Sequence, residues 1–390
     1  MFSSKTKIGV IGSGAMGSGI AQVAATAGHL VVLYDSNAGQ LSKAKSSLAS
    51  TLKMLAEKGK ISAGDADLIL QRIQFAEKLD SFRDCGLIIE AIIEQLSVKQ
   101  EVFSELEKIV PASCVLATNT SSLSITSIAA SCKDPSRVIG IHFFNPAPVM
   151  PLVEIIPGIV TNSAITEAVK KLVDSWGKTT VLAKDTPGFI VNRVARSYYG
   201  ESIRIYEEGI ADFATIDWAM KTFGGFKMGP FELMDFIGND VNYAVTETVW
   251  QQFYYEPRFK PSLTQKRLYE AKMFGRKSGS GYYDYADGAV KPQPKSDELA
   301  GRQIFMRVLS MLINEAADAL YLGVASREDL DTAMMKGVNY PKGLLKWCDE
   351  IGVKAIYETL QKLFDQYGED RYRPCILLKR MAAGNKAFFV

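Results

Sequence analysis

The first half of the chain alternates short, continuous apolar runs with longer segments in which apolar residues recur at helical spacing. The apolar runs suit strands buried on both faces of a sheet. They lie at residues 8–12, 30–34, 84–93, 114–118, 138–144, 152–156 and 179–182. Helices are expected between them, at residues 18–28, 36–70, 97–110 and 165–176. Strands alternating with helices through right-handed crossovers predict an α/β doubly wound sheet.

The apolar strand pattern stops after the sequence Lys184-Asp-Thr-Pro-Gly188. Helical spacing follows at residues 189–208, 212–222, 230–236 and 242–253, and again from about residue 299 to the end. Glycine-rich and proline-rich segments at residues 278–282 and 287–294 separate these two helical stretches. We therefore expect three domains: residues 1–184, an all-α module at 185–290, and a second all-α module at 291–390.

The two helical modules form an internal repeat. Shifting the sequence by 114 positions aligns Glu201 with Glu315. Glycines, acids and apolar pairs then coincide without a gap, as for Gly229 with Gly343. The second copy has Met306 where the first has Asn192, so it has lost a polar group that the first could offer to a ligand.

A glycine motif follows the first predicted strand. Gly12, Gly14 and Gly17 read G-x-G-x-x-G, with Ala15 and Met16 between the last two glycines. A strand, a glycine turn and a helix start bring backbone N–H groups and the positive helix end together, where a pyrophosphate can bind. The sequence therefore predicts a Rossmann-type dinucleotide-binding domain.

An acid occupies the position expected to bind the ribose of the dinucleotide. Asp35 ends the second predicted strand, 18 residues after Gly17. Its charge would repel a 2′-phosphate, and the next two residues, Ser36 and Asn37, carry no cation. This pattern favours NAD over NADP.

Composition excludes several other classes of protein. The chain has 45 basic and 43 acidic residues, which argues against nucleic-acid or membrane partners. Its five cysteines show no C-x-x-C spacing, so we expect neither disulfides nor a metal site. The amino-terminal residues contain no apolar signal core or presequence, and no apolar run is long enough to span a bilayer. A cytoplasmic location is expected.

Oxidation of an alcohol by NAD needs a base that removes the hydroxyl proton, and histidine titrates in the right range. Only two histidines are present. His29 follows the first helix and is expected at the surface, whereas His142 lies near the carboxyl end of a predicted strand, where ligands of open α/β sheets bind. Glu154 stands alone in an apolar strand and is the candidate partner of His142. The alternatives are a core histidine and a solvent-facing carboxylate on an edge strand.

Three further polar residues are candidate substrate contacts. Ser121 and Asn145 follow strands that should end at the same edge of the sheet, and Asn192 opens the first helix of the second domain. For each of them, a role as a turn or cap residue is the alternative.

Several long motifs, in order, resemble those of the L-3-hydroxyacyl-CoA dehydrogenases. They are Gly12–Gly17, Asn119–Ser122, His142–Pro146 with Pro151–Glu154, Asp185–Arg193, Gly229–Asp235 and Phe274–Tyr282. The resemblance implies reversible oxidation of (S)-3-hydroxyacyl-CoA to 3-ketoacyl-CoA with NAD. His142 would be the general base and Glu154 its partner, with Ser121 and Asn192 contacting the substrate.

The resemblance also implies the ligand contacts. Those with NAD would be Gly12, Gly14, Ala15, Met16, Gly17, Asp35, Glu94, Lys99, Asn119, Ser121, Asn145 and Lys277. Those with coenzyme A would be Thr51 and Lys58.

The second helical module resembles that of longer family members, where it can take the place of a partner subunit. A monomer with an internal pseudo-dimer, or a homodimer, is therefore expected, with one active site per chain. Two other interpretations compete: a dehydrogenase of a small free hydroxy acid, as in the related gulonate group, and a non-catalytic nucleotide-binding protein.

Overall fold

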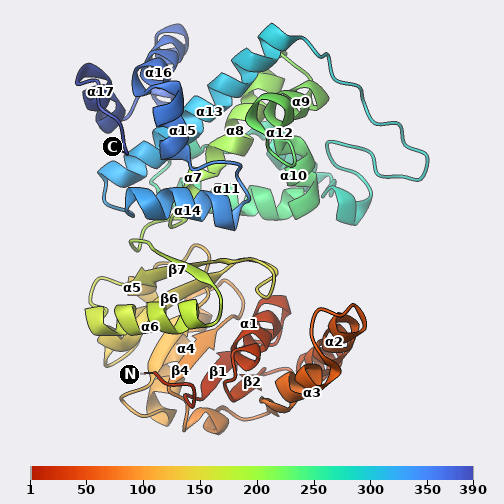
Figure 1. The fold of residues 1–390 in the computed structure, drawn as a ribbon, viewed down its shortest axis with the longest axis vertical. Helices are drawn as coiled ribbons and strands as arrows, with labels where there is room; N and C mark the ends of the chain where they lie inside the picture. The colour runs from red at the N-terminus through yellow and green to blue at the C-terminus, as the bar shows by residue number, and fades with distance from the viewer. Residues whose placement is uncertain (1, 390) are drawn as a thin grey trace. The chain divides into compact units, whose positions relative to one another are not determined.

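The computed structural model describes residues 2–389, which divide into two compact units with a boundary between residues 189 and 190. Figure 1 shows strands only in the first unit, coloured red to yellow-green, and helices throughout the second, coloured green to blue. The boundary lies five residues after the end predicted for the first domain.

One sheet forms the centre of the first unit. Its strands, in spatial order, are β3 (Ile73–Ala76), β2 (Val31–Tyr34), β1 (Ile8–Ile11), β4 (Leu87–Glu90), β5 (Val115–Thr118), β6 (Val138–Phe143), β7 (Leu152–Pro157) and β8 (Thr179–Leu182). The strands from β3 to β6 all pair in parallel. Across the sheet the strand numbers fall from β3 to β1 and then rise from β4, so the chain order reverses between β1 and β4. This reversal is the crevice where doubly wound sheets bind ligands.

The last two strands run the opposite way, because β7 pairs with β6 antiparallel and β8 pairs with β7 in parallel. The sequence pattern predicted these strands but not their direction. Residues 144–151 connect β6 to β7 directly. The start of β7 therefore lies beside the end of β6, at the edge of the sheet where the parallel strands also end.

Helices cover the sheet and close its core. They are α1 (Ala15–Thr26), α2 (Ala38–Glu57), α3 (Ala63–Gln71), α4 (Leu96–Ile109), α5 (Ile125–Ala129) and α6 (Ser163–Ser175). One core cluster joins Val10 and Ile89 of the strands to Ile20 of α1, Leu48 of α2 and Val169 of α6. The doubly wound sheet predicted from the sequence is confirmed.

Three details of the sequence prediction are wrong. The single helix expected over residues 36–70 is two helices, because Gly59 turns the chain at φ +66° and Ser62 caps α3. The edge strand β3 was not predicted, since only its two end residues are buried. His29 is only 3% exposed: its Nδ1 lies 2.9 Å from the carbonyl of Thr6 and its ring packs edge-on against Trp176.

The second unit is built from helices, with one long segment at residues 271–297 that holds only a short 3-10 turn and two isolated bridges. Its first half contains α7 (Val191–Val194), α8 (Arg196–Glu207), α9 (Phe213–Gly224), α10 (Pro230–Ile237), α11 (Asn239–Gln252) and α12 (Leu263–Glu270). Its second half contains α13 (Glu298–Tyr321), α14 (Arg327–Gly337), α15 (Leu344–Ile351), α16 (Val353–Tyr367) and α17 (Ile376–Ala383). A shift of 114 residues superimposes α8 on the end of α13, and then carries α9, α10, α11 and α12 onto α14, α15, α16 and α17.

Side-chain contacts repeat with the same shift. Asp217 accepts hydrogen bonds from the backbone of Phe231 and Glu232, and Asp331 accepts the equivalent pair from Leu345 and Lys346. In each copy one glycine must lack a side chain, because a Cβ on Gly229 or Gly343 would lie 2.3 Å from that aspartate. The internal repeat predicted from the sequence is confirmed.

The two copies exchange reciprocal ion pairs. Arg193 Nε donates to Glu315 Oε1 at 2.5 Å, and the equivalent Arg307 Nε donates to Glu201 Oε1 at 2.6 Å. All four side chains are almost fully buried. A reciprocal contact of this kind is the signature of a two-fold interface, here formed within one chain.

Replacing Glu315 with alanine should destabilise the second unit strongly. The change removes the buried carboxylate that pairs with both Arg193 and Arg258. The two cations then share Asp318, and only Arg258 has a further carboxylate, Glu256. We expect the free energy of unfolding to fall by about 3–5 kcal/mol in a urea titration. On the same helix, Glu298→Ala breaks an exposed ion pair with Arg302 and should cost less than about 1 kcal/mol. Equal losses in the two variants would contradict the argument.

Candidate active site

The glycine turn after β1 has the geometry of a phosphate cradle. Gly12 has φ +93°, and a Cβ there would lie 2.4 Å from the carbonyl oxygen of Ala91. A Cβ on Gly17 would lie 1.7 Å from the carbonyl oxygen of Gly12, so only glycine lets α1 pack this close to the strand. Gly14 precedes the first residue of α1, and a Cβ there would meet nothing within 4 Å. The turn therefore leaves no room for a side chain at Gly12 and Gly17. It is open at Gly14, next to Ala15 and Met16, which begin the helix.

Asp35 is held in place beside this turn. The backbone N–H and the hydroxyl of Ser13 both donate to Asp35 Oδ2, at 2.8 and 2.9 Å, and the N–H of Asn37 donates to Oδ1 at 2.9 Å. Burial raises the pKa of Asp35, but these hydrogen bonds outweigh it and lower the pKa overall. The carboxylate is therefore charged and oriented before any ligand binds.

A polar cavity of about 400 Å³ lies next to the turn, between α1 and α2. Its walls include Ser13, Gly14, Lys43 and Thr51. Lys58, seven residues after Thr51, caps the end of α2, is exposed and does not line the cavity. The structure thus places one of the two predicted coenzyme A contacts beside the glycine turn, and the other further along the helix.

Glu94 lies just after β4 and accepts several hydrogen bonds. Its Oε1 accepts from the hydroxyl of Thr120 at 2.6 Å and from the N–H of Ser121 at 2.8 Å. Its Oε2 lies 3.3 Å from Lys99 Nζ. Burial raises the pKa of Glu94, but the charge of Lys99 and the hydrogen bonds lower it overall.

Lys99 is more deeply buried than a residue that contacts a ligand at the surface would be. It is 1% exposed, and its Nζ donates to Glu90 Oε1 at 2.6 Å. Glu90, fully buried at the end of β4, also accepts from the hydroxyl of Thr118 at 2.7 Å. The ammonium thus links a buried carboxylate to Glu94, which borders the predicted nicotinamide side.

His142 and Glu154 form a buried pair across two strands. They are direct partners in the antiparallel register of β6 and β7, and His142 Nδ1 lies 2.7 Å from Glu154 Oε2. His142 is 6% exposed and Glu154 fully buried. The rings of Phe144 and Phe189 flank the imidazole, with centroids 4.5 and 5.9 Å away. A carboxylate beside Nδ1 keeps the imidazole proton on Nδ1, so Nε2 is unprotonated and can accept a proton. A general base needs this tautomer.

Asn119 follows β5, and Asn145 follows β6, the strand that carries His142. The side-chain oxygen of Asn119 accepts a hydrogen bond from the N–H of Phe143 at 2.8 Å and so ties the end of β5 to β6. Asn145 is exposed in the connection that follows β6. Both lie at the edge of the sheet where His142 and Ser121 also lie.

The remaining predicted site residues belong to the second unit. Asn192 lies on α7 and is partly buried. Lys277 Nζ pairs with Asp240 Oδ1 at 2.6 Å. Their participation in the site stays a prediction.

Sequence reasoning missed three residues that organise the site: Ser13, Glu90 and Thr120. Ser13 was inside the glycine motif but was given no role. An acid ending an otherwise apolar strand was a usable signal for Glu90. Thr120 lay inside the quoted Asn119–Ser122 motif, but its contact with Glu94 depends on a turn that spacing does not predict.

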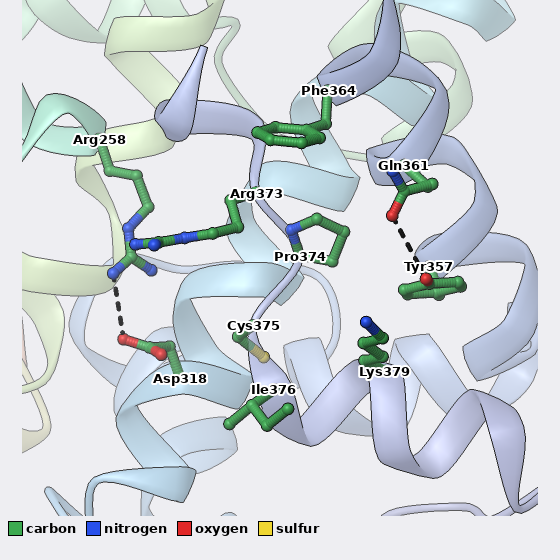
Figure 2. A pocket seen from close by; sticks show the side chains of 10 residues that line it. All are labelled: Arg258, Asp318, Tyr357, Gln361, Phe364, Arg373, Pro374, Cys375, Ile376 and Lys379. Carbon is green, nitrogen blue, oxygen red and sulfur yellow. Dashed lines mark hydrogen bonds and ion pairs between the residues drawn. The ribbon is translucent and has the colours of Figure 1, made fainter. Parts of the chain in front are cut away.

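A different cavity, of about 560 Å³, lies in the second unit among α13, α16 and α17. Figure 2 shows Arg258 bound to Asp318 at one side and the Tyr357–Gln361 hydrogen bond at the other. None of the residues predicted to bind NAD or substrate lines it, so it is not the candidate active site.

Comparisons with known families match almost the whole chain. The family described as "3-hydroxyacyl-CoA dehydrogenase, NAD binding domain" matches residues 7–186. The family described as "3-hydroxyacyl-CoA dehydrogenase, C-terminal domain" matches twice, at residues 188–285 and 304–387. The double match agrees with the internal repeat.

Individual proteins of similar sequence and structure carry related names. A 3-hydroxyadipyl-CoA dehydrogenase of Escherichia coli is 39% identical over 96% of this chain and 97% of its own length. The human mitochondrial hydroxyacyl-coenzyme A dehydrogenase is 41% identical over 71% of this chain and 90% of its own. The crystal structure of an E. coli 3-hydroxybutyryl-CoA dehydrogenase superimposes with a TM-score of 0.91 at 38% identity, covering 98% of this chain and 99% of that one.

Two glycine substitutions should separate ligand binding from folding. Gly14→Ala places a methyl group in open space where the phosphate would approach, so the melting temperature should be unchanged while NADH binds about tenfold or more weakly. Gly17→Ala drives a methyl group into the Gly12 carbonyl and should lower the melting temperature itself. Fluorescence titration with NADH and thermal melting measure the two effects. Unchanged NADH affinity in Gly14→Ala would exclude the cradle.

Proposed function

Because the chain belongs to the 3-hydroxyacyl-CoA dehydrogenase family and oxidises 3-hydroxyacyl-CoA to 3-ketoacyl-CoA with NAD, we propose that His142, oriented by Glu154, is the general base of this reaction. The single observation that supports this most is the 2.7 Å contact between His142 Nδ1 and Glu154 Oε2 at the edge of the sheet.

The proposed proton path is short. As the hydride leaves C3 of the (S)-3-hydroxyacyl group, the imidazole Nε2 takes the hydroxyl proton. Glu154 stabilises the imidazolium that results, because its charge is buried against the ring. NAD, when bound, would supply the acceptor for the hydride. In the reverse direction the imidazolium returns the proton to the oxygen of the 3-keto group.

The glycine turn and Asp35 support the proposed mode of NAD binding. The open face at Gly14 and the start of α1 suit the pyrophosphate, and the oriented carboxylate of Asp35 suits two ribose hydroxyls. Glu94, Asn119, Ser121 and Asn145 would border the nicotinamide, with Lys99 holding Glu94. Lys277 would contact NAD from the second unit.

For the substrate, we propose contacts with Ser121 and Asn192 at the reacting end and with Thr51 and Lys58 at coenzyme A. Thr51 has the stronger support because it lines the polar cavity beside the turn. One relative is named for 3-hydroxyadipyl-CoA and a structural relative for 3-hydroxybutyryl-CoA, so we propose a short acyl chain.

The organisation of the chain is also part of the proposal. We divide it into residues 1–184, 185–290 and 291–390, with one active site. The reciprocal ion pairs between the helical copies support an internal pseudo-dimer, in a chain that is a monomer or assembles further as a homodimer. No helix described within residues 2–389 could cross a membrane. We propose a cytoplasmic location.

Replacing His142 with glutamine should abolish turnover while leaving NADH binding intact. Loss of a positioned base costs roughly a hundred- to ten-thousandfold in rate. Oxidation of NADH by acetoacetyl-CoA measures it, and no turnover of this substrate by the wild type would favour the free hydroxy-acid alternative. The matched control is His29→Gln, which removes the other buried histidine and should cost stability but not chemistry.

Replacing Asp35 with asparagine should relax the choice of cofactor. The variant loses the negative charge that excludes a 2′-phosphate, so the ratio of kcat/KM for NADP to that for NAD should rise about tenfold or more. Ser13→Ala is the control, because it removes one hydrogen bond to Asp35 but leaves the charge. An equal rise in Ser13→Ala would mean that the shape of the turn, not the charge, selects NAD.

A further inference from the structure

One buried cation in the second unit has no carboxylate partner within the part of the chain that the structure describes. Arg196, the first residue of α8, is 7% exposed. Its Nε donates to the carbonyl of Asn192 at 2.9 Å, its Nη1 donates to the hydroxyl of Thr246 at 3.1 Å, and its guanidinium lies 4.9 Å from the centroid of the Tyr199 ring. No ion pair to it is found among residues 2–389, whereas the neighbouring Arg193 pairs with both Glu315 and Asp318.

A buried hydroxyl near Arg196 also lacks a partner. Tyr340, on the connection between α14 and α15, is 5% exposed, and within the described residues its hydroxyl has no hydrogen-bond partner. Burial raises the pKa of Tyr340 well above its usual value, while the charge of Arg196 acts in the opposite direction. The Tyr340 ring packs 5.8 Å from Tyr198, and Tyr198 packs 5.8 Å from Tyr199, the ring that Arg196 contacts. The guanidinium and Tyr340 therefore belong to one buried cluster.

The hydroxyl needs a hydrogen-bond acceptor, and the guanidinium needs an acceptor that carries negative charge. A guanidinium has only donors, and a buried hydroxyl without a partner loses the hydrogen bond that it makes in water. A buried charge without a counter-charge is strongly unfavourable. The carbonyl of Asn192, the hydroxyl of Thr246 and the ring of Tyr199 are all neutral, so they leave the charge of Arg196 without a counter-charge. A carboxylate accepts from both groups and neutralises the charge.

The position of Arg196 indicates that this carboxylate belongs to the substrate. Asn192 lies one helical turn earlier, about 6 Å along the axis. The Arg196 guanidinium folds back toward that turn, as its contact with the Asn192 carbonyl shows. A substrate held at its reacting end by Asn192 would thus present the far end of a short acyl chain to Arg196.

We propose that Arg196 and Tyr340 bind the terminal carboxylate of a 3-hydroxyacyl-CoA whose acyl chain ends in an acid. The inference rests on the proposed function, because it takes Asn192 as a substrate contact. It makes Arg196 a residue that determines specificity, and it gives the second helical copy, through Tyr340, a part in choosing the substrate.

The test compares two substrates of equal length. 3-Hydroxyadipyl-CoA ends in a carboxylate and 3-hydroxyhexanoyl-CoA in a methyl group. The wild type should prefer the first by tenfold or more in kcat/KM. Arg196→Met should lower this preference roughly ten- to a hundredfold, mainly through KM, and Arg196→Lys should retain part of it. No wild-type preference, or an unchanged preference in Arg196→Met, would overturn the proposal.

Tyr340→Phe keeps the proposal testable if Arg196→Met does not fold. It removes only the hydroxyl, so the melting temperature should stay the same or rise, while the preference for the dicarboxylic substrate falls several-fold. The matched control is Tyr198→Phe, whose hydroxyl donates to the Met228 carbonyl at 2.8 Å and whose ring packs 5.8 Å from Tyr340. It should lose stability and keep the preference. An unchanged preference in Tyr340→Phe would exclude a role for Tyr340.

The outcomes also distinguish a failure of this inference from a failure of the proposed function on which it rests. If the wild type oxidises neither substrate and does not reduce acetoacetyl-CoA, the proposed function fails. If it oxidises both substrates equally well, the proposed function stands and the assignment of Arg196 is wrong.

Discussion

The buried carboxylate of Glu154 is the constraint on which the proposed active site depends. An ionised side chain inside an apolar strand costs several kcal/mol unless a partner compensates it. Antiparallel pairing of β6 and β7 places His142 directly opposite, and a slip of one residue in that register would turn one side chain to the other face. The direction of β7 therefore determines whether the proposed base, His142, has a carboxylate beside its Nδ1.

Around this pair, the acids at the edge of the sheet are held by hydrogen bonds before a ligand arrives. Asp35 is bound by the Ser13 and Asn37 backbone, and Glu94 by Thr120 and Ser121. Lys99 connects Glu94 to the buried Glu90. Groups that are already oriented need little rearrangement when substrate and cofactor bind, which favours reaction over binding alone.

Features with a local or periodic cause were predictable from the sequence. The glycine turn follows from the steric needs of three positions, and the repeat from residues that coincide at a constant shift. His29 was misplaced because its burial depends on Trp176, which lies far along the chain. The break between α2 and α3 depends on one left-handed glycine. The pairing of His142 with Glu154 was inferred from charge burial, but the strand direction that produces it is a tertiary property.

The contacts of the second unit were beyond sequence reasoning for a similar reason. Arg193 and Glu315 are separated by more than a hundred residues, and nothing near either one indicates the other. Arg196 stood one turn from a candidate residue and was not noticed, because only the structure shows that its charge is buried and uncompensated.

The duplicated helical modules carry an evolutionary consequence. In a homodimer every substitution at the interface occurs twice, so a change that helps one subunit is imposed on the other. Tandem copies in one chain escape this symmetry: Asn192 and Met306 occupy equivalent positions and have diverged. One copy can then keep a polar side chain while the other copy diverges. Because both copies belong to one chain, they do not dissociate on dilution.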